Sequence, residues 1–305
     1  MTNLLKQEIS ITGKRAEIVS INCIKKLRDD IGELCRNSSL NDYAKEIVNN
    51  YFDFNLPEAE FEIRSIIVVA SPSPIVKVDF SYQFKKYQFM IPPTYIEMTK
   101  AHKEIEIYLN SFLNPQGFHA LTTPCLPLKL LAARSGISAY GRNNICYING
   151  MGSFFRLQTY YSDIPSKNEN WYDLSTMKQC KTCKACLNSC PTNAITTKSH
   201  FVNTDRCITH INENDGTVFP AWLEPSAHNC LIGCFKCQAC CPINKEYLNN
   251  IIEPVQFSEE ETLILLENKP FDQLPRALAE KLEALDMKHY YGALVRNLKA
   301  LLELG

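Results

Sequence analysis

The sequence lacks the long apolar run that a membrane-spanning helix needs. About 18 or more consecutive apolar residues identify such a helix, and no stretch of the 305 residues approaches that length. Residues 1–8 also lack the apolar core of a secretory signal peptide. We therefore expect a soluble, reduced, cytoplasmic protein with no membrane partner.

An excess of charge of either sign is also missing. The formal net charge is −1, whereas proteins that bind nucleic acid through bulk electrostatics carry a basic surplus. Any contact with nucleic acid would therefore have to rest on a local basic patch. The 45% hydrophobic content is sufficient for one large domain or two smaller ones with a sizeable core.

Cysteine is the residue type that the chain has in excess. The 14 cysteines fall below the ~8–10% typical of a small disulfide scaffold, and they cluster along the chain instead of spreading. Disulfides need an oxidising compartment, and nothing in the sequence indicates one. Clustered cysteines in such a chain favour metal binding.

The densest cluster of cysteines spans residues 180–191 and reads Cys-Lys-Thr-Cys-Lys-Ala-Cys-Leu-Asn-Ser-Cys-Pro. Its spacings of three, three and four residues, closed by proline, match the ligand run of a bacterial-type [4Fe–4S] ferredoxin. In two-cluster ferredoxins the cysteine before proline ligates the other cluster, so this run predicts a second one. A second run is present at 234–242, as Cys-Phe-Lys-Cys-Gln-Ala-Cys-Cys-Pro.

Exchange of the Cys-Pro cysteines between the two runs predicts the ligands of two clusters. Cluster one would take Cys180, Cys183, Cys186 and Cys241. Cluster two would take Cys190, Cys234, Cys237 and a fourth ligand, for which spacing leaves both Cys207 and Cys230 open. The alternative of structural zinc fits less well, because zinc sites usually pair two separated Cys-x-x-Cys knuckles.

Hydrophobic periodicity predicts an α+β fold. We expect helices over 14–52, 94–112 and 126–135, the last closed by Gly136 as a C-cap. Apolar or alternating runs predict strands at 66–70, at 76–84 and 87–91 on either side of Lys85-Lys86, and at 145–148, with 154–161 a strand or a short helix. Ser258 and Glu261 form a predicted capping box that opens a helical tail.

These elements predict three segments. Residues 1–170 would form an N-terminal α+β substrate domain, 171–250 a ferredoxin-like module with two [4Fe–4S] clusters, and 251–305 a C-terminal helical segment.

The cysteine pattern resembles that of the epoxyqueuosine reductases, whose double-cluster module is shared with reductive dehalogenases. Besides the first run, the matching residues are Arg206-Cys207-Ile-Thr and Gly233-Cys-x-x-Cys-Gln-x-x-Cys241-Pro-x-Asn244. In that family the isolated middle cysteine is a ligand of the second cluster. The resemblance therefore favours Cys207 over Cys230 and makes Cys240 a cysteine that is not a ligand.

The resemblance continues upstream, where residues 133–143 look like the segment with which the family approaches a corrinoid. It implies that the cofactor is contacted by Gly136, Tyr140, Gly141, Arg142 and Asn143. It also implies an N-terminal corrinoid-reductase-like α/β domain that binds cobalamin. The family reduces epoxyqueuosine in tRNA with electrons that pass through the clusters from a ferredoxin- or flavodoxin-type donor.

Three departures from the family pattern point away from tRNA. The loop 121–127 lacks the aspartate that the family is proposed to use as a proton donor. The family's Arg-Gly-Arg-Asp-Tyr-His stretch is replaced by residues 88–95, and the chain ends at Gly305 without extra helical repeats. The sequence thus supports two functions: a corrinoid-type iron–sulfur reductase, or a non-catalytic electron carrier that activates a partner, such as a corrinoid protein. A structural iron–sulfur scaffold is a third, weaker interpretation.

Overall fold

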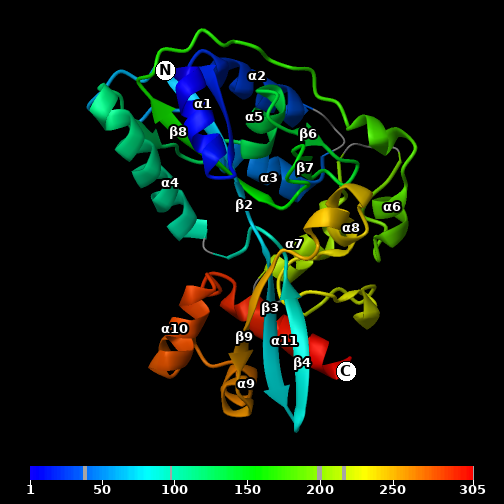
Figure 1. The fold of residues 1–305 in the computed structure, drawn as a ribbon. Coiled ribbons are helices and arrows are strands. Elements are labelled where there is room, and N and C mark those ends of the chain that lie inside the picture. The colour runs from blue at the N-terminus through cyan, green and yellow to red at the C-terminus, as the bar shows by residue number, and fades with distance from the viewer. Residues whose placement is uncertain (37–39, 97, 198–200, 215–217, 305) are drawn as a thin grey trace. The chain divides into compact units, whose positions relative to one another are not determined.

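The computed structural model describes residues 1–36, 40–96, 98–197, 201–214 and 218–304. The chain divides into two compact units, each of which is assembled from two stretches of sequence (Figure 1). Unit one comprises Met1–Pro72 and Lys100–Thr182, and unit two comprises Ser73–Thr99 and Cys183–Gly305. Helices and strands occur in both units, which confirms the α+β class, while the three functional segments expected from the sequence stay a prediction.

Unit one is built on a four-stranded antiparallel sheet in the order β1-β2-β8-β5. The strands are β1 (Arg15–Ser20), β2 (Ser65–Pro72), β8 (Phe155–Ser162) and β5 (Ala120–Thr122). Its helices are α1 (Thr2–Ile11), α2 (Cys23–Arg36), α3 (Asp42–Asn50), α4 (Met98–Leu113), the short η1 (Asn114–Gln116) and α5 (Leu128–Arg134). A two-stranded ribbon follows α5 and consists of β6 (Ala139–Tyr140) and β7 (Cys146–Tyr147).

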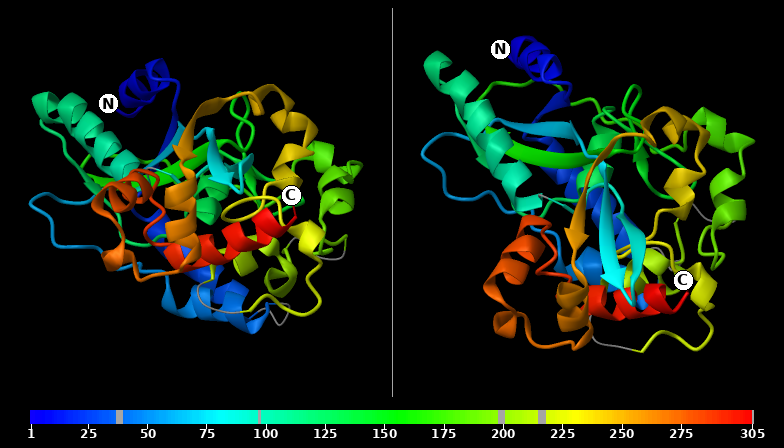
Figure 2. Two further views of the ribbon diagram at one scale, coloured as in Figure 1. Left: turned by 90° about the horizontal axis from the view of Figure 1, so that it is seen from below. Right: turned by 60° about the horizontal axis from the view of Figure 1, so that its bottom comes forward.

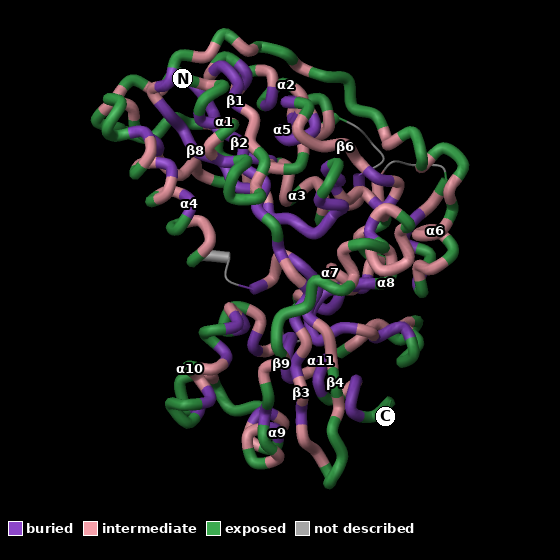
Figure 3. Tube along the Cα trace, in the orientation of Figure 1, coloured by how far each residue is buried: buried purple, intermediate pink, exposed green. Residues whose placement is uncertain are grey.

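The central strand β2 is buried on both faces, which explains its continuous apolar run. Ile67 and Val69 pack in one core with residues of α1 and α4, whereas Ile66 and Val68 pack in another with residues of α2 and α5. Helices therefore cover both faces of the sheet (Figure 2). Strand β2 and its neighbour β8 are both buried along almost their whole length (Figure 3).

The predicted helix over 14–52 is wrong at its beginning, because β1 occupies 15–20. Ile18 and Val19 are both buried but belong to opposite cores, which is the alternation of a strand. Pairing with β2, in which Ile18 lies opposite Ile67, favours the extended backbone over the helical spacing of the isoleucines. The rest of the segment forms α2 and α3, although residues 37–39 lie outside the described part of the chain.

Unit two holds a three-stranded sheet in the order β4-β3-β9. The hairpin strands are β3 (Ile75–Tyr82) and β4 (Lys85–Ile91), as the alternation predicted, but the turn lies at Gln83 and Phe84. Both turn residues have positive φ, of 51° and 63°, as a two-residue type I′ hairpin turn requires. The lysines expected in the turn are therefore the first residues of β4.

The C-terminal segment begins with a strand that the sequence analysis missed. Residues Ile251–Phe257 form β9, parallel to β3, and α9 (Glu259–Leu266) then starts at the predicted capping box of Ser258 and Glu261. The helices α10 (Arg276–Ala284) and α11 (Tyr291–Glu303) follow, with η6 (Phe271–Gln273) between α9 and α10. Their apolar faces pack with the sheet in one core.

The cysteine-rich part of the chain has short elements joined by loops. They are η2 (Lys178–Lys181), α6 (Ala185–Ser189), η3 (Thr204–Arg206), α7 (Ile208–Glu213), η4 (Pro225–Ala227), α8 (Lys236–Ala239) and η5 (Pro242–Tyr247). Among the described residues, none of the helices is long and apolar enough to cross a membrane.

Candidate metal centre

The two cysteine runs have the same local backbone. Lys184 precedes α6 with φ −121° and ψ 12°, and Phe235 precedes α8 with φ −110° and ψ −8°. Each run ends in a Cys-Pro pair with extended backbone: Cys190 has φ −71° and ψ 112°, and Cys241 has φ −72° and ψ 122°, as proline demands of its predecessor. The two short helices pack against each other. The sequence repeat is therefore also a structural repeat.

Two of the predicted cluster-two sulfurs accept hydrogen bonds from N–H groups. The backbone N–H of Ala194 lies 3.3 Å from Cys190 Sγ, and Asn229 Nδ2 lies 3.3 Å from Cys234 Sγ. Such bonds stabilise a thiolate and are among the means by which proteins tune iron–sulfur clusters. Burial raises the pKa of the Cys234 thiol, and the Asn229 amide acts in the opposite direction.

Cys207 lies at the N-terminus of α7 and has a similar environment. Burial raises the pKa of its thiol, while hydrogen bonds from the backbone N–H groups of Thr209 and His210 favour the thiolate. The charges of Cys190 and Cys207 each raise the pKa of Cys234 further. The structure thus brings Cys190, Cys207 and Cys234 into one neighbourhood, together with the α8 segment that carries Cys237.

The two cysteines that the resemblance leaves out each lie beside an oxygen acceptor. The fully buried Cys230 donates its S–H to Asn229 Oδ1 at 3.2 Å. Burial raises the pKa of Cys230 well above the usual value, while a hydrogen bond from the backbone N–H of Phe235 acts in the opposite direction. Cys240 donates to the carbonyl oxygen of Cys237 at 3.6 Å.

The predicted ligands of cluster one are distributed over both units. Cys180 lies in η2, which belongs to unit one, whereas Cys183, Cys186 and Cys241 belong to unit two. Cys186 lies within α6, and Cys241 directly follows the partner helix α8 and its C-cap. The closure of cluster one by Cys180 stays a prediction.

All 14 cysteines are free thiols. The described residues contain no group of three or more His, Cys, Asp or Glu side chains arranged to hold a single metal ion. A four-iron cluster differs from a single ion because each thiolate binds its own iron, at a separate corner.

The predicted cofactor segment is engaged with the protein itself. Gly136 has φ 84°, and a Cβ atom there would lie 2.6 Å from Cε2 of Tyr172. A Cβ atom on Gly141 would lie 2.6 Å from both Cε2 of Tyr147 and Oδ1 of Asn143. Tyrosine rings thus cover the faces of both glycines that a ligand would approach.

The polar residues of this segment hold the backbone around Cys180. The carbonyl oxygen of Tyr140 accepts a 2.8 Å hydrogen bond from the N–H of Met177, and the Arg142 guanidinium donates to the carbonyl oxygen of Cys180. Burial raises the pKa of Tyr140. Asn143 is buried and donates to the Tyr147 hydroxyl at 3.0 Å. The contacts of these residues are therefore with η2 and with the ribbon β6–β7.

Comparison with known proteins bears on the cysteine module and on the fold separately. The family described as "4Fe-4S double cluster binding domain" matches residues 179–244. The chain is 32% identical to the epoxyqueuosine reductase of Aliivibrio fischeri over 116 residues, which are 38% of this chain and 30% of that protein. It is 24% identical to that of Cellulophaga algicola over 226 residues, which are 73% and 71% of the two chains. The match spans about a third of the length of the first curated relatives.

Solved structures of epoxyqueuosine reductases share the fold. One from Bacillus subtilis, with its catalytic aspartate loop swung out of the active site, gives a TM-score of 0.63 at 18% identity and covers 99% of this chain and 82% of its own. Another, with an epoxyqueuosine-modified tRNA stem loop, gives a TM-score of 0.65 at 18% identity and the same coverage. The chain thus shares the fold of these epoxyqueuosine reductases, and its match to the double-cluster domain covers residues 179–244.

The loop in which the resemblance leads one to expect an aspartate, residues 121–127, contains no carboxylate. In residues 121–127, the Thr123 hydroxyl lies 2.5 Å from that of Thr159, and Cys125 is exposed. The backbone N–H of Asp53 donates to the carbonyl oxygen of Cys125 at 3.0 Å, which ties the chain after α3 to this loop. The loop therefore offers hydroxyl and thiol groups but no carboxylate.

The cysteine module fits four-iron clusters, because the sulfurs of Cys190, Cys207 and Cys234 accept N–H bonds. Of the five residues expected to contact cobalamin, Gly136 and Gly141 have the rings of Tyr172 and Tyr147 on the side where a Cβ atom would lie. We therefore derive no step through cobalamin, and the cofactor role of these five residues stays a prediction.

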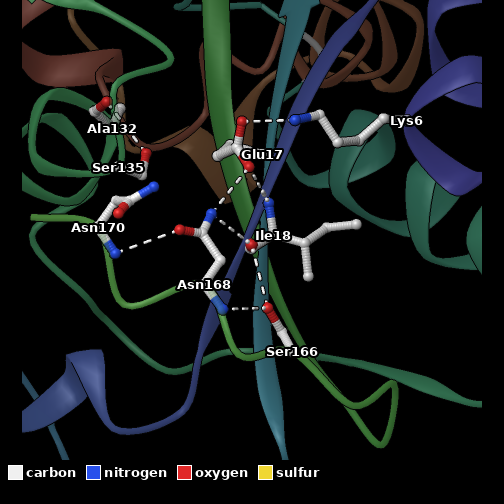
Figure 4. A network of polar contacts seen from close by, with 8 residues as sticks. All are labelled: Lys6, Glu17, Ile18, Ala132, Ser135, Ser166, Asn168 and Asn170. Carbon is white, nitrogen blue, oxygen red and sulfur yellow. Dashed lines mark hydrogen bonds and ion pairs between the residues drawn. The ribbon is translucent and has the colours of Figure 1, made fainter. Parts of the chain in front are cut away.

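A polar cavity of ≈ 370 Å³ lies in unit one, and its lining includes Ser135, the residue before Gly136, and Tyr172. Lys6 Nζ and Glu17 Oε2 are 2.7 Å apart, and Asn168 Nδ2 donates to Glu17 Oε1 at 3.2 Å and to the Ile18 carbonyl oxygen at 3.1 Å (Figure 4). These contacts fasten the loop after β8 to β1. The sequence could not predict the cavity, because its lining comes from four separate stretches of the chain, one of which is Ser135 alone.

Substitution of Gly136 by alanine should destabilise the protein by about 1–2 kcal/mol, the cost of a left-handed conformation for a residue with a Cβ atom. Gly32→Ala is the matched control, because Gly32 lies within α2 and its added Cβ would be 3.7 Å from the nearest atom, the tip of Arg36. That change should stabilise the protein by about 0.5–1 kcal/mol. Denaturant unfolding followed by circular dichroism measures both, and equal effects would contradict the strained turn at Gly136.

Proposed function

We propose that the chain is an iron–sulfur oxidoreductase of the epoxyqueuosine reductase type that receives electrons through two [4Fe–4S] clusters. The observation that carries the proposal is that the two cysteine runs repeat each other in structure. In addition, the sulfurs of Cys190 and Cys234 in the runs, and of Cys207 between them, accept N–H bonds. Such clusters accept and release one electron at a time, at potentials tuned by hydrogen bonds to sulfur. The donor would be a ferredoxin- or flavodoxin-type protein.

The proposed ligands follow from this repeat. Cys180, Cys183, Cys186 and Cys241 would hold cluster one, and Cys190, Cys207, Cys234 and Cys237 would hold cluster two. The choice of Cys207 over Cys230 follows the family resemblance, because backbone N–H groups bond to both sulfurs and Cys230 in addition lies beside Asn229 Oδ1. Asn229 contacts both cysteines. Its amide N–H group donates to the sulfur of Cys234, and its amide oxygen accepts from the S–H of Cys230.

The substrate that we propose to test first is the epoxide of epoxyqueuosine in a tRNA stem loop, as the names of the relatives indicate. Conversion of an epoxide to an alkene breaks two C–O bonds, forms the C=C bond and releases the oxygen as water, so it consumes two electrons and two protons. Unit one would bind the substrate, and its loop 121–127 offers hydroxyl and thiol groups there.

A second candidate is a non-catalytic electron carrier that reduces a partner, such as a corrinoid protein. Two observations favour it: the loop 121–127 carries no carboxylate, and tyrosine rings cover Gly136 and Gly141. In this function the cysteine module would act as in the first candidate, but unit one would bind no substrate.

One anaerobic experiment separates the candidates. The reconstituted chain, reduced by dithionite, is incubated with an epoxyqueuosine-containing stem loop, and the nucleosides are analysed by mass spectrometry. The reductase proposal predicts queuosine, whereas reducible clusters without product would favour the carrier. Parallel titration with cob(II)alamin tests the acceptor, because a saturable shift to the base-off spectrum would assign a corrinoid site to the chain.

A further inference from the structure

Tyr95 follows strand β4 and reaches into the cysteine-rich part of unit two. Its hydroxyl donates a short hydrogen bond to Oε1 of Glu213. Glu213 is the last residue of α7, the helix that begins directly after Cys207. Burial raises the pKa of Tyr95 well above its usual value, so the phenol stays protonated as the donor.

The same phenol occupies the space beside Gly233, the residue before Cys234. Gly233 has φ 66°, and a Cβ atom there would overlap the Tyr95 hydroxyl oxygen and lie 2.8 Å from Cζ. The lack of a side chain at this position therefore lets the ring approach the backbone. One side chain thus contacts the segments that carry two proposed ligands of cluster two.

Buried amides tie the same two segments together. Asn212 Nδ2 donates to the carbonyl oxygen of Gly233 at 3.0 Å, and Asn297 Nδ2 donates to the carbonyl oxygens of Asn212 and Leu231, each at 2.9 Å. Both asparagines are fully buried. The two amides hold α7 against residues 231–233. Tyr95, which follows the β3–β4 hairpin, contacts both of these segments as well.

The backbone that presents Tyr95 is strained. Thr94 has φ 86°, a conformation that is an outlier for a β-branched residue, and its N–H donates to Ser73 Oγ at 2.9 Å. Such strain persists where the surrounding structure imposes it, often beside a functional site. A tyrosine that only filled the core would not need this conformation.

We propose that Tyr95 is a positioning residue for the second cluster, which sets the spacing between the Cys207 and Cys234 segments through its contacts with Glu213 and Gly233. The inference rests on the proposed function, because it requires cluster two to form. Tyr95 touches neither ligand sulfur in this proposal and acts through the two backbone segments.

Tyr95→Phe tests the role, because it keeps the ring and removes the donor. The matched control is Tyr291→Phe in the same unit, since the Tyr291 hydroxyl is buried and has no hydrogen-bond partner among the described residues. In the anaerobically reconstituted full chain, we expect Tyr95→Phe to weaken retention of cluster two against an iron chelator by less than the about 10–100-fold that loss of a direct partner of a ligand costs, because Tyr95 acts through the backbone. Its EPR signal and midpoint potential should change, while cluster one stays as in the wild type.

Two variants of Glu213 keep the test decisive if Tyr95→Phe does not fold. Glu213→Ala removes the same hydrogen bond from the acceptor side and should weaken cluster two alone, whereas Glu213→Gln keeps an acceptor oxygen and should preserve it. Unaltered EPR signals and retention in Tyr95→Phe or Glu213→Ala would overturn the role of Tyr95. A wild-type chain that takes up iron for only one cluster would overturn the proposed function, and this inference with it.

The pH dependence of stability gives an independent check on Glu213. Burial raises the pKa of this carboxyl in the folded protein, so its contribution to stability is present below the unfolded-state pKa and is lost as the pH rises through the folded-state pKa. Glu213→Gln cannot ionise, so its stability relative to the wild type should increase as the pH rises above about 4.3. Denaturant unfolding at a series of pH values measures this difference, and a constant difference would contradict the buried carboxyl.

Discussion

The Cys207→Ala chain will hold cluster one and lose cluster two. The sulfur of Cys207 accepts backbone N–H bonds at the start of α7 and lies in the neighbourhood of Cys190 and Cys234, so its removal takes one corner ligand from that cluster. Iron and sulfide content after anaerobic reconstitution should fall by about half, since one of two equal clusters is lost. One of the two EPR signals of the reduced protein should disappear.

Cys230→Ala is the matched control for this prediction. Cys230 is also buried in unit two and lies near the second run, but its S–H donates to Asn229 Oδ1. We expect both clusters to remain in this variant, with a small loss of stability of about 1 kcal/mol from the missing hydrogen bond. Loss of a cluster in Cys230→Ala, with retention of both in Cys207→Ala, would reverse the ligand assignment.

Loss of either cluster should stop conversion of the epoxyqueuosine stem loop. Cys186→Ala removes a ligand of cluster one within α6, and we expect product formation to fall at least about 100-fold, because even outer-shell partners of a metal site are worth 10–100-fold. The variant should still bind the stem loop, since the substitution lies in the cysteine module. Single-turnover mass spectrometry with dithionite as reductant measures the rate.

Cys240→Ala serves as the control for turnover. Its S–H donates to the carbonyl oxygen of Cys237, and the proposal gives it no ligand role, so turnover should stay within about a factor of ten of the wild-type rate, the effect of a 1.4 kcal/mol change. Equal conversion by wild type and Cys186→Ala would show that electrons reach the substrate without cluster one.

The sequence predicted the features that depend on local spacing. The cysteine runs, the capping box of Ser258 and the buried strand around 66–70 each involve residues close together in the chain, and the structure confirms the capping box and the strand. The errors occurred where distant segments decide the conformation. Residues 15–20 and 251–257 became strands because they pair with β2 and β3, and local periodicity contains no information on those partners.

The same distinction applies to the site. Spacing could not choose between Cys207 and Cys230, because their surroundings arise only in the folded chain: Cys207 lies at the start of α7, whereas Cys230 is fully buried beside Asn229. The resemblance implied that Gly136 contacts a cofactor, but the ring of Tyr172, from a later part of the chain, lies on the side of Gly136 where a Cβ atom would be. The contact of Tyr95 with Gly233 likewise arises from tertiary packing.

Iron and acid-labile sulfide quantification of the anaerobically reconstituted chain, combined with EPR of the reduced protein, tests the central claim most directly. Two clusters held by eight cysteines predict the iron content of two four-iron clusters per chain and two overlapping or coupled signals from low-potential centres. Iron for a single cluster, or stable binding of zinc in its place, would contradict the account.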